Sequence, residues 1–380
     1  MSEAGAHRSG FIALVGRPNV GISTLLNQIL GEIIAIISDM PQTTRTRILG
    51  VRHLPKAQLV FLDTPGIHKP LYRLNQRMVR VALEVLDEVD LVFFLVEATE
   101  GVGAGDRYVV ERLKERAVPV VLVINKVDLV QKGRLLPLID AYRQMHEFAE
   151  IVPISALTGD GVNRLVEIAV RFMPVGPVYF EDDIVTDQPM QLLAAEFIRE
   201  KILQKTRDEL PFSVAVQIES FIEEEARFSE RRSGDPLPDS EATERVSVGP
   251  EGEGAGEEGR VSARPGREGA MEKGPVPAGP GHGKEEAALT ASGRAGDISG
   301  AIAGRKRDGR LARVSAIVYV EKESQKAIVI GKRGELLKAV GTEARIEMER
   351  LFGMKVFLQL WVKVKEGWRQ DEQMLSTLGY

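Results

Sequence analysis

The chain of 380 residues contains no cysteine. This absence excludes disulfides and every metal site that needs a thiolate ligand, and it is typical of a reducing cytosol. Long apolar runs are also missing, because the two longest, at 91–98 and 118–124, are far shorter than the roughly 20 residues of a membrane-spanning helix. The first ten residues, MSEAGAHRSG, have no apolar signal core. We therefore expect a cytoplasmic protein.

A broad basic surface is absent as well, since the formal net charge is −5. This balance argues against a nucleic-acid-binding coat over the whole molecule, but it leaves a local basic patch open. The hydrophobic fraction of 43% and the charged fraction of 28% are those of globular proteins that bury a core. The length predicts two or three domains.

Strand-length apolar runs alternate with helical patterns between about residues 11 and 173. This alternation predicts an α/β domain with a mostly parallel sheet covered by helices on both faces. The expected strands are Phe11–Val15, Arg47–Arg52, Gln58–Leu62, Leu91–Glu97, Val118–Ile124 and Ile151–Ile154, and the expected helices are Ser23–Leu30, Asn75–Glu88, Asp106–Arg116, Leu135–Glu150 and Val162–Phe172. Ligands of such folds bind beyond the carboxyl ends of the strands, so the residues that follow each strand are the candidates.

A glycine-rich stretch, GRPNVGISTLLNQIL, connects the first strand to the first helix. Such a turn directs backbone N–H groups at one point beside the positive end of the helix dipole, which suits a phosphate. The P-loop pattern requires Gly, four residues, Gly, Lys and then Ser or Thr. Gly16, Gly21 and Ser23 satisfy it, but Ile22 occupies the lysine position. Alone, the stretch fits a phosphate loop or an ordinary glycine turn.

Three further motifs follow predicted strands: DTPG at 63–66, NKVD at 125–128 and SAL at 155–157. Asp63 is placed to hold the magnesium ion of a nucleotide, and the N–H of Gly66 to reach a γ-phosphate. The Asp128 carboxylate can accept two parallel hydrogen bonds from guanine, whereas adenine would be repelled. Each motif alone is compatible with a turn, but their joint occurrence in this order predicts a guanine-nucleotide domain. The expected nucleotide-contacting residues are Gly16, Arg17, Pro18, Asn19, Val20, Gly21, Ile22, Ser23, Thr24, Asp63, Thr64, Pro65, Gly66, Ile67, Asn125, Lys126, Asp128, Ser155, Ala156 and Leu157.

The combination of GRPNVG, PQTTRTRILG (41–50), DTPGIHKP (63–70), NKVD and SAL resembles the Era GTPases, a bacterial class whose G domain precedes an RNA-binding domain. The resemblance implies GTP and GDP as ligands and Mg²⁺ held by Ser23, Asp63 and Thr44, the last in preference to Thr43. It implies catalytic roles for Thr44, Gly66 and Asn19, whose counterpart in related GTPases helps to bind K⁺. The alternative for Asn19 is a loop asparagine that bonds its own backbone. Ile67 is apolar and cannot orient water.

The second half of the chain divides into a linker, a second domain and an insertion. The proline-rich, acidic residues 174–189 are the expected linker, and a helix at Met190–Glu209 and a strand at Ser213–Ile222 follow. Residues 229–310 hold 17 of the 37 glycines, 7 of the 19 prolines and no aromatic residue. Such a segment cannot bury enough apolar surface to offset the entropy of ordering, so we expect a disordered insertion. It is either a solvated linker or a regulatory or RNA-contacting segment.

Order is expected to resume at residue 311. A strand at Arg313–Val320, a short helix at Ser324–Ile330, the loop GKRG (331–334), a helix to Leu351 and a strand at Lys355–Lys365 then follow. A GxxG turn between two helices on a small sheet predicts a KH module, in which the glycines let a nucleic-acid backbone approach closely. GxxG alone is a weak signal, but VYVEKESQKAIVIGKRG, TEAR and KVFLQLWVKVKEGWR also resemble the Era C-terminal domain. The order of elements predicts type II KH topology.

Six residues are the expected RNA contacts of this module: Ile330, Gly331, Lys332, Arg333, Gly334 and Lys338. From Arg313 onward there are 12 Lys and Arg and 9 Asp and Glu, a net +3 that suits one single-stranded RNA segment better than a duplex. Ile328, Val329 and Ile330 are assigned to the core or to the groove floor. Trp361 is expected to pack in the sheet, and Trp368 fits either a buried or an exposed place.

The resemblance covers the chain except the flexible first ten residues and the insertion. It implies a GTP-hydrolysing switch, active as a monomer, that binds the 3′ region of 16S ribosomal RNA and assists assembly of the 30S subunit. It also allows a peripheral contact with the membrane, for which the sequence has no anchor. A guanine-nucleotide-binding RNA-binding module with little or no GTPase activity is the alternative, because Ile22, Ile33 and Met40 stand where lysine is expected. Arg17 and Lys69 are the cations available to compensate. A metabolic P-loop kinase is disfavoured, because NKVD selects a base and no acceptor site is evident.

Overall fold

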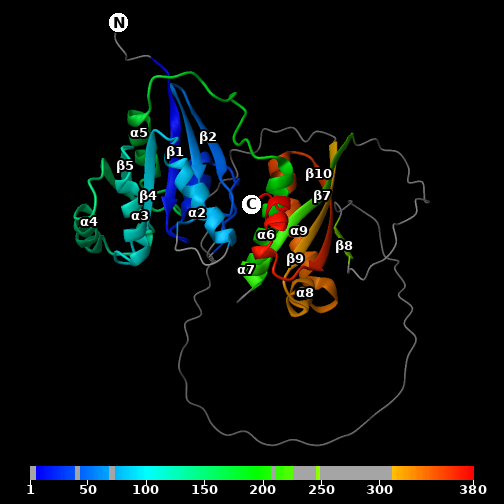
Figure 1. Ribbon diagram of the computed structural model, residues 1–380. Coiled ribbons are helices and arrows are strands. Elements are labelled where there is room, and N and C mark those ends of the chain that lie inside the picture. The colour runs from blue at the N-terminus through cyan, green and yellow to red at the C-terminus, as the bar shows by residue number, and fades with distance from the viewer. Residues whose placement is uncertain (1–5, 39–42, 68–72, 207–209, 226–244, 249–309) are drawn as a thin grey trace, which may run out of the picture.

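The computed structural model describes residues 6–38, 43–67, 73–206, 210–225, 245–248 and 310–380, which form two domains (Figure 1). In the first domain, six strands have the spatial order β2-β3-β1-β4-β5-β6. They are β1 (Arg8–Gly16), β2 (Ile48–Leu54), β3 (Ala57–Asp63), β4 (Leu91–Glu97), β5 (Val120–Asn125) and β6 (Glu150–Pro153). All neighbours pair in parallel except β2 with β3. The predicted α/β domain with a mostly parallel sheet is confirmed.

Helices cover both faces of this sheet. They are α1 (Ile22–Leu30), α2 (Arg73–Val85), α3 (Ala104–Lys114), α4 (Leu135–Arg143) and α5 (Val162–Phe172). Side chains of β1 alternate between two apolar clusters, Ile12 and Leu14 in the one that includes α1 and α5, Ala13 and Val15 in the other. Because successive side chains of a strand point to opposite faces, this alternation places one cluster on each side of the sheet.

Helix α4 is shorter than the prediction of Leu135–Glu150, because it ends at Arg143. Beyond it, Met145 and Phe148 pack against the core, and the Phe148 ring stacks on Phe94 with a centroid distance of 6.3 Å. The chain therefore leaves the helix to turn these side chains inward before β6.

The linker residues 174–189 run along the first domain. The main-chain oxygen of Val185 accepts a hydrogen bond of 2.8 Å from the N–H of Val51. The Gln58 side chain accepts hydrogen bonds from the N–H groups of Tyr179 and Phe180 and donates to the main-chain oxygen of Phe180. These contacts dock the linker on the sheet before the second domain begins.

The second domain is built on a four-stranded sheet of order β7-β9-β10-β8. Its elements are α6 (Met190–Lys205), α7 (Leu210–Ser213), β7 (Ala215–Glu225), β8 (Arg245–Val248), β9 (Arg310–Val320), α8 (Glu323–Ile330), α9 (Glu335–Phe352), β10 (Lys355–Val364) and α10 (Glu372–Thr377). Strands β7 and β9 are antiparallel partners, and β9 pairs in parallel with β10. The predicted α+β KH domain follows the G domain. Helix α6 ends at Lys205 rather than at residue 209.

The predicted insertion, residues 229–310, lies outside the described residues except for β8 and for Arg310, the first residue of β9. Within it the structure describes β8, whose residues Arg245–Val248 pair antiparallel with residues 358–361 of β10. Two valines in this four-residue strand favour the extended backbone that pairing requires.

The C-terminal residues lie between the two domains, beside α2 (Figure 1). Within the described ranges, no helix combines the length and the apolar character needed to cross a bilayer.

Candidate functional site

A cavity of about 420 Å³ opens at the carboxyl ends of the central strands of the first sheet. The turn between β1 and α1, the segment before β2, the turn after β3 and the end of β4 all contribute to its wall. Of the predicted nucleotide contacts it brings together Arg17, Pro18, Asn19, Gly21, Ile22, Ser23, Thr24, Thr64, Gly66 and Lys126, and it also includes the predicted metal ligand Thr44. Asp128 and the SAL residues are not among its lining residues.

The glycine-rich turn has a backbone that few other side chains allow. Gly21 has φ +96°, and a Cβ atom there would lie 2.3 Å from Nδ2 of Asn125. Asn19, which is exposed, also has a positive φ of 68°. A Cβ on Gly16 would lie 2.6 Å from the main-chain oxygen of Leu95. The two glycines thus allow a tight turn against neighbouring backbone, as a phosphate loop requires. Val20 is buried in the core beneath it.

Ile22 is the first residue of α1, and its side chain is 8% exposed. It belongs to the apolar cluster of α1 and α5 and also lines the cavity. The position of the P-loop lysine is therefore occupied by a side chain that adds to the core and brings no charge to the cavity.

Two cations line the cavity wall, and each is held by carboxylates. Nε of Arg17 lies 2.7 Å from Oδ1 of Asp106, and Arg17 also pairs with Glu100 at 3.0 Å. Nζ of Lys126 lies 2.8 Å from Oε2 of Glu97. Lys69, the other cation considered for compensation, lies outside the described residues. Each lining cation is therefore already paired with a carboxylate.

Ser23, Asp63 and Thr44 meet although 40 residues separate the first two. Ser23 donates a hydrogen bond of 2.8 Å to Oδ2 of Asp63, and the hydroxyl oxygens of Ser23 and Thr44 lie 2.9 Å apart. Asp63 is fully buried, and its other oxygen, Oδ1, has no hydrogen-bond partner among the described residues. Burial raises the pKa of Asp63 to about 7, and the hydrogen bond from Ser23 opposes part of this shift.

This arrangement fits a magnesium ion. A buried carboxylate with an unused oxygen beside two hydroxyl groups is the hard-oxygen ligand set that Mg²⁺ takes next to nucleotide phosphates. A cation there would also stabilise the negative charge of the Asp63 carboxylate, which burial disfavours. The three predicted metal ligands are thus the residues that the fold brings together.

The turn after β3 lies against the phosphate loop. The N–H of Ile67 donates a hydrogen bond of 2.9 Å to the main-chain oxygen of Gly16, and Thr64 donates to Leu14 at 2.9 Å. A Cβ on Gly66 would lie 2.8 Å from the main-chain nitrogen of Pro18, so Gly66 permits this approach. Ile67 is fully buried in the core, and Pro65 is also buried. Ile67 therefore points away from the cavity.

Asn125 connects the loop after β5 to both neighbouring turns. Its Nδ2 donates to the main-chain oxygen of Val20 at 2.7 Å, and its Oδ1 accepts from the N–H of Ala156 at 2.9 Å. Lys126 has a positive φ of 64°, and Asp128, two residues later, is exposed. Ser155 is buried, whereas the Leu157 side chain is 75% exposed. The exposed Asp128 carboxylate, on a loop that Asn125 fixes to Val20 and Ala156, can accept hydrogen bonds from the edge of a planar base.

The GKRG loop of the second domain forms the turn between α8 and α9. Its first and last glycines have φ values of +74° and +78°, and Arg333 between them has φ +54°. Lys332, Arg333 and Lys338 are exposed. The loop thus presents two adjacent cations on a backbone that only glycine ends permit, which suits close contact with a phosphodiester chain.

The structure changes the assignment of the apolar residues before this loop. Ile330 is 7% exposed and lies in the core of the second domain, as does Val329, whereas Ile328 is 51% exposed. Ile328, which was not among the expected contacts, is therefore the apolar side chain available beside the loop. Trp361 is partly buried, and Trp368 is fully buried.

Sequence reasoning also missed Arg45, which follows Thr44 and contacts the second domain. Its guanidinium donates hydrogen bonds to the main-chain oxygen of Val214 at 2.8 Å and to the Tyr380 hydroxyl at 3.1 Å. No local pattern reveals such a contact, because its partners lie 169 and 335 positions away. Its position beside Thr44, the threonine predicted to bind magnesium, was the available signal.

Comparison with known proteins matches residues 11–126 to the family of 50S ribosome-binding GTPases and residues 302–369 to the KH domain. GTPase Era of Geobacter metallireducens is 43% identical over 373 residues, which span 98% of each chain. GTPase Era of Syntrophus aciditrophicus is 40% identical over 98% of this chain and 95% of its own. A crystal structure of Era in complex with MgGDPNP and nucleotides 1506–1542 of 16S ribosomal RNA is 34% identical, with a TM-score of 0.74 over 98% of this chain and 99% of that one. A structure of Aquifex aeolicus Era bound to GDP·AlF4⁻ is 33% identical, with a TM-score of 0.73 over 98% of this chain and 99% of that one.

Proposed function

The chain belongs to the Era family of GTPases, and we propose that it is a GTP-hydrolysing switch that binds 16S ribosomal RNA and assists assembly of the 30S subunit. The observation that carries this proposal is the correspondence, over nearly the whole chain, to an Era that holds MgGDPNP and the 3′ part of 16S ribosomal RNA. The phosphate turn and the GKRG loop occur together in this one chain. The switch acts in the cytoplasm as a monomer, with the 30S subunit as its partner and with a peripheral contact at the cytoplasmic face of the membrane.

In this proposal the first cavity binds the phosphates of GTP or GDP. The main-chain N–H groups between Gly16 and Thr24 surround the phosphates at the positive end of α1. Ser23, Thr44 and Asp63 hold Mg²⁺, which when bound neutralises charge on the β- and γ-phosphates. Asp63 is ionised in that complex, since the cation favours its charged form over the neutral form that burial favours.

Guanine is selected by the exposed Asp128 carboxylate, which accepts hydrogen bonds from the N–H and amino groups of the base. Asn125 fixes the loop that carries Asp128 to the phosphate turn and to Ala156. The N–H of Ala156 is already used by Asn125, so the SAL turn supports the base site by holding its shape. Lys126 packs beside the base with its ammonium tied to Glu97.

Hydrolysis relies on main-chain groups and on Asn19. The N–H of Gly66 would reach the γ-phosphate, and Asn19 at its positive φ would help to hold a potassium ion, which would supply positive charge beside the phosphates. Ile67 is buried and orients no water. Turnover with K⁺ above turnover with Na⁺ is the expected result.

Ile22 favours a second candidate function, a guanine-nucleotide-binding module with little turnover. A charged hydrogen bond contributes roughly 1.5–3 kcal/mol, so the missing lysine weakens nucleotide binding about tenfold to a hundredfold. If its loss resembles that of one oxyanion donor, hydrolysis slows by roughly 10²- to 10³-fold. Both lining cations are paired with carboxylates, which gives no direct replacement.

RNA binding is assigned to the GKRG loop, with Lys338 and Ile328 beside it. The decisive experiment measures binding of GDP, ATP and a single-stranded RNA of the 3′ end of 16S ribosomal RNA to the full chain. We expect GDP to bind and ATP not to compete. Gly331→Asp should abolish RNA binding and leave GDP affinity unchanged.

Gly367→Asp is the matched control. Gly367 also has a positive φ, +63°, but it is exposed and a Cβ there meets no atom within 4 Å. Lys332→Ala with Arg333→Ala tests the loop without altering its glycines. RNA binding that survives in both loop variants would refute the assignment of this loop, and competition by ATP would refute the guanine site.

A further inference from the structure

The segment that leads from α1 to β2 contacts the second domain before the undescribed residues 39–42. Ile36 lies in the apolar core of the second domain, with Phe197 and Ile198 of α6. The N–H of Ile37 donates a hydrogen bond of 2.8 Å to Oε1 of Glu200, also on α6. Ile37 and Thr44 both line the nucleotide cavity, so the second domain holds part of the cavity wall.

The same segment contacts the second domain again beyond residue 42. Arg199 of α6 donates to the main-chain oxygen of Thr43. Arg45 is 4% exposed, and its guanidinium carbon lies 5.6 Å from the ring centroid of Trp368 and 5.5 Å from that of Tyr380. Its hydrogen bonds to Val214 and Tyr380 complete this site. Thr44 is therefore flanked on both sides by residues whose partners belong to the second domain.

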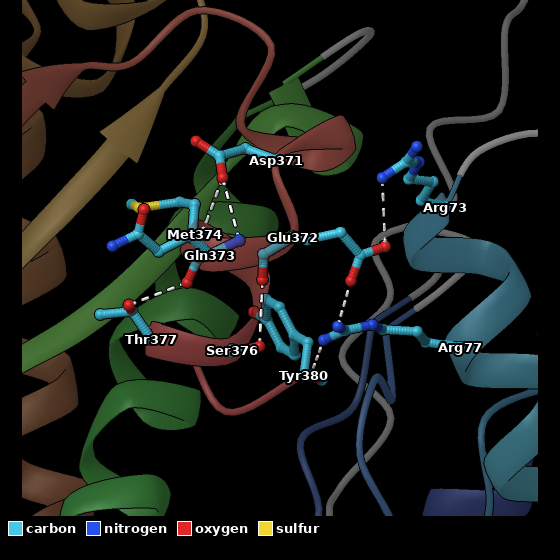
Figure 2. A network of polar contacts seen from close by, with 9 residues as sticks. All are labelled: Arg73, Arg77, Asp371, Glu372, Gln373, Met374, Ser376, Thr377 and Tyr380. Atoms are coloured by element: carbon cyan, nitrogen blue, oxygen red, sulfur yellow. Dashed lines mark hydrogen bonds and ion pairs between the residues drawn. The ribbon is translucent and has the colours of Figure 1, made fainter.

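Residues 368–380, here called the C-terminal segment, contact α2 as well. Arg77 donates to Glu372 and to the main-chain oxygen of Tyr380, and Arg73 lies 3.4 Å from Glu372 (Figure 2). Beneath this polar layer, α2 and the C-terminal segment form one apolar cluster, with Leu74 and Met78 on one side and Trp368, Leu375 and Leu378 on the other. Helix α2 follows the DTPG turn in the chain. The C-terminal segment therefore contacts residues next to both Thr44 and the DTPG turn, which lie on two sides of the nucleotide site.

The C-terminal segment has a defined local structure. Trp368 is anchored by a hydrogen bond of 2.9 Å from Nε1 to the main-chain oxygen of Ser213. The Asp371 carboxylate accepts hydrogen bonds from the N–H groups of Gln373 and Met374 and so begins α10 (Figure 2). A segment fixed in this way can hold Arg45 in one position.

We propose that the C-terminal segment couples the nucleotide site to the RNA-binding domain, with Arg45 as the positioning residue that places the Thr44 hydroxyl through its contacts with Trp368 and Tyr380. The inference rests on the proposed function, since it assumes that both ligands bind. A nucleotide with a γ-phosphate, together with Mg²⁺, favours the conformation in which Arg45 positions the Thr44 hydroxyl. It therefore favours the arrangement of the domains in which the C-terminal segment contacts both of them. By thermodynamic reciprocity, RNA that prefers this arrangement strengthens binding of the same nucleotide.

The Arg77–Glu372 pair allows a test that folding does not confound. The side chains are 31% and 50% exposed, so neither is needed for a core. The full chain is compared as unaltered protein, as Arg77→Glu, as Glu372→Arg and as the double variant with exchanged charges. For each, the dissociation constant for the 16S 3′ RNA is measured with saturating Mg·GDP and with saturating Mg·GDPNP, a GTP analogue that is not hydrolysed.

We expect the unaltered chain to bind RNA at least about tenfold more tightly with GDPNP than with GDP, a typical magnitude of coupling between two sites. Each single variant should bring this ratio close to one. The double variant should restore only part of it, because Glu372 also pairs with Arg73 and Arg77 also donates to the main-chain oxygen of Tyr380. Arg112→Glu is the control, because Arg112 forms a surface ion pair with Glu115 and should leave the ratio unchanged. A ratio of one in the unaltered chain or unchanged ratios in the single variants would each overturn the proposal.

Arg45→Lys separates positioning from packing. Lysine keeps the charge but loses the planar group that donates to two partners and contacts two aromatic rings. We expect affinity for Mg·GDPNP to fall about tenfold, roughly the effect of one charge-assisted hydrogen bond. Affinity for GDP in EDTA should be unchanged. An equal loss for both nucleotides would indicate a purely structural role and overturn the proposal.

The failure of this inference differs from failure of the proposed function. If the unaltered chain bound neither guanine nucleotide nor RNA, the proposed function itself would fail. If it bound both, with ratios independent of Arg77 and Glu372, only the role of the C-terminal segment would be refuted.

Discussion

Replacement of Ile22 by lysine would return a cation to the first residue of α1, where the phosphates approach the helix. The new ammonium group would give a charge-assisted hydrogen bond worth roughly 1.5–3 kcal/mol. We therefore expect GTP and GDP to bind about tenfold to a hundredfold more tightly. Turnover of bound GTP should rise by roughly 10²- to 10³-fold if the lysine acts on the transition state as one oxyanion donor does.

The same substitution should make the nucleotide-free protein less stable. The Ile22 side chain is 8% exposed and packs in the cluster of α1 and α5. Full burial of such a side chain contributes about 1.5–3 kcal/mol, but the methylene groups of lysine can retain part of that contact while the ammonium reaches the cavity. We expect the free energy of unfolding of Ile22→Lys to be about 1 kcal/mol lower than that of the unaltered chain without nucleotide, and higher with saturating GDP.

The assay is single-turnover hydrolysis of GTP in K⁺, with thermal unfolding recorded with and without GDP. Ile22→Met is the matched control, because it keeps an apolar side chain of similar volume and adds no charge. It should bind and hydrolyse GTP as the unaltered chain does. Turnover by Ile22→Lys no faster than that of Ile22→Met would refute the idea that this position limits hydrolysis.

Three further predictions concern the same domain. Asp128→Asn removes an acceptor of two guanine hydrogen bonds and should weaken GDP binding by at least about tenfold without changing thermal stability, which calorimetry can measure; unchanged affinity would contradict the base site. Because burial raises the pKa of Asp63 to about 7, the folded state without metal or nucleotide holds a proton that the unfolded state has lost above its ordinary value of 3.8. The free energy of unfolding should therefore fall as the pH rises from about 4 to about 7. Urea titrations of Asp63→Asn should lack this part of the pH dependence. Gly21→Ala forces a Cβ to within 2.3 Å of Asn125 Nδ2 at φ +96°, and should destabilise the domain by about 1–3 kcal/mol with loss of GDP binding; normal binding would show that the turn relaxes.

The sequence predicted which turns lie at the same edge of the sheet, because its motifs are short and follow parallel strands. Asp63 meets Ser23, and Asn125 meets Val20, through the geometry of the sheet, which the alternation of strands and helices already implied. The end of α4 depended instead on packing, because Phe148 must reach Phe94 before β6 begins. Helical periodicity alone could not locate that end.

Contacts between the domains could not be predicted from sequence. Arg45 and Trp368 are far apart in the chain, and neither belongs to a pattern that would pair them. Ile33, which stands where lysine was expected, packs against the core of the second domain, so its apolar character has a structural reason. Met40, the third such position, lies outside the described residues. Of Ile328 and Ile330, both assigned to the core or the groove floor, only Ile330 lies in the core, because the turn of α8 decides which one faces the solvent.

Strand β8 has a consequence for association between molecules. Without it, residues 358–361 of β10 would present unpaired N–H and C=O groups at an open sheet edge, which is a template for pairing with another chain. The insertion supplies its own chain to this edge and so acts as protection against intermolecular β-pairing. Shortening the insertion by removal of residues 229–309 would expose the edge, whereas a deletion that leaves 245–248 and enough chain to reach it would keep the edge covered.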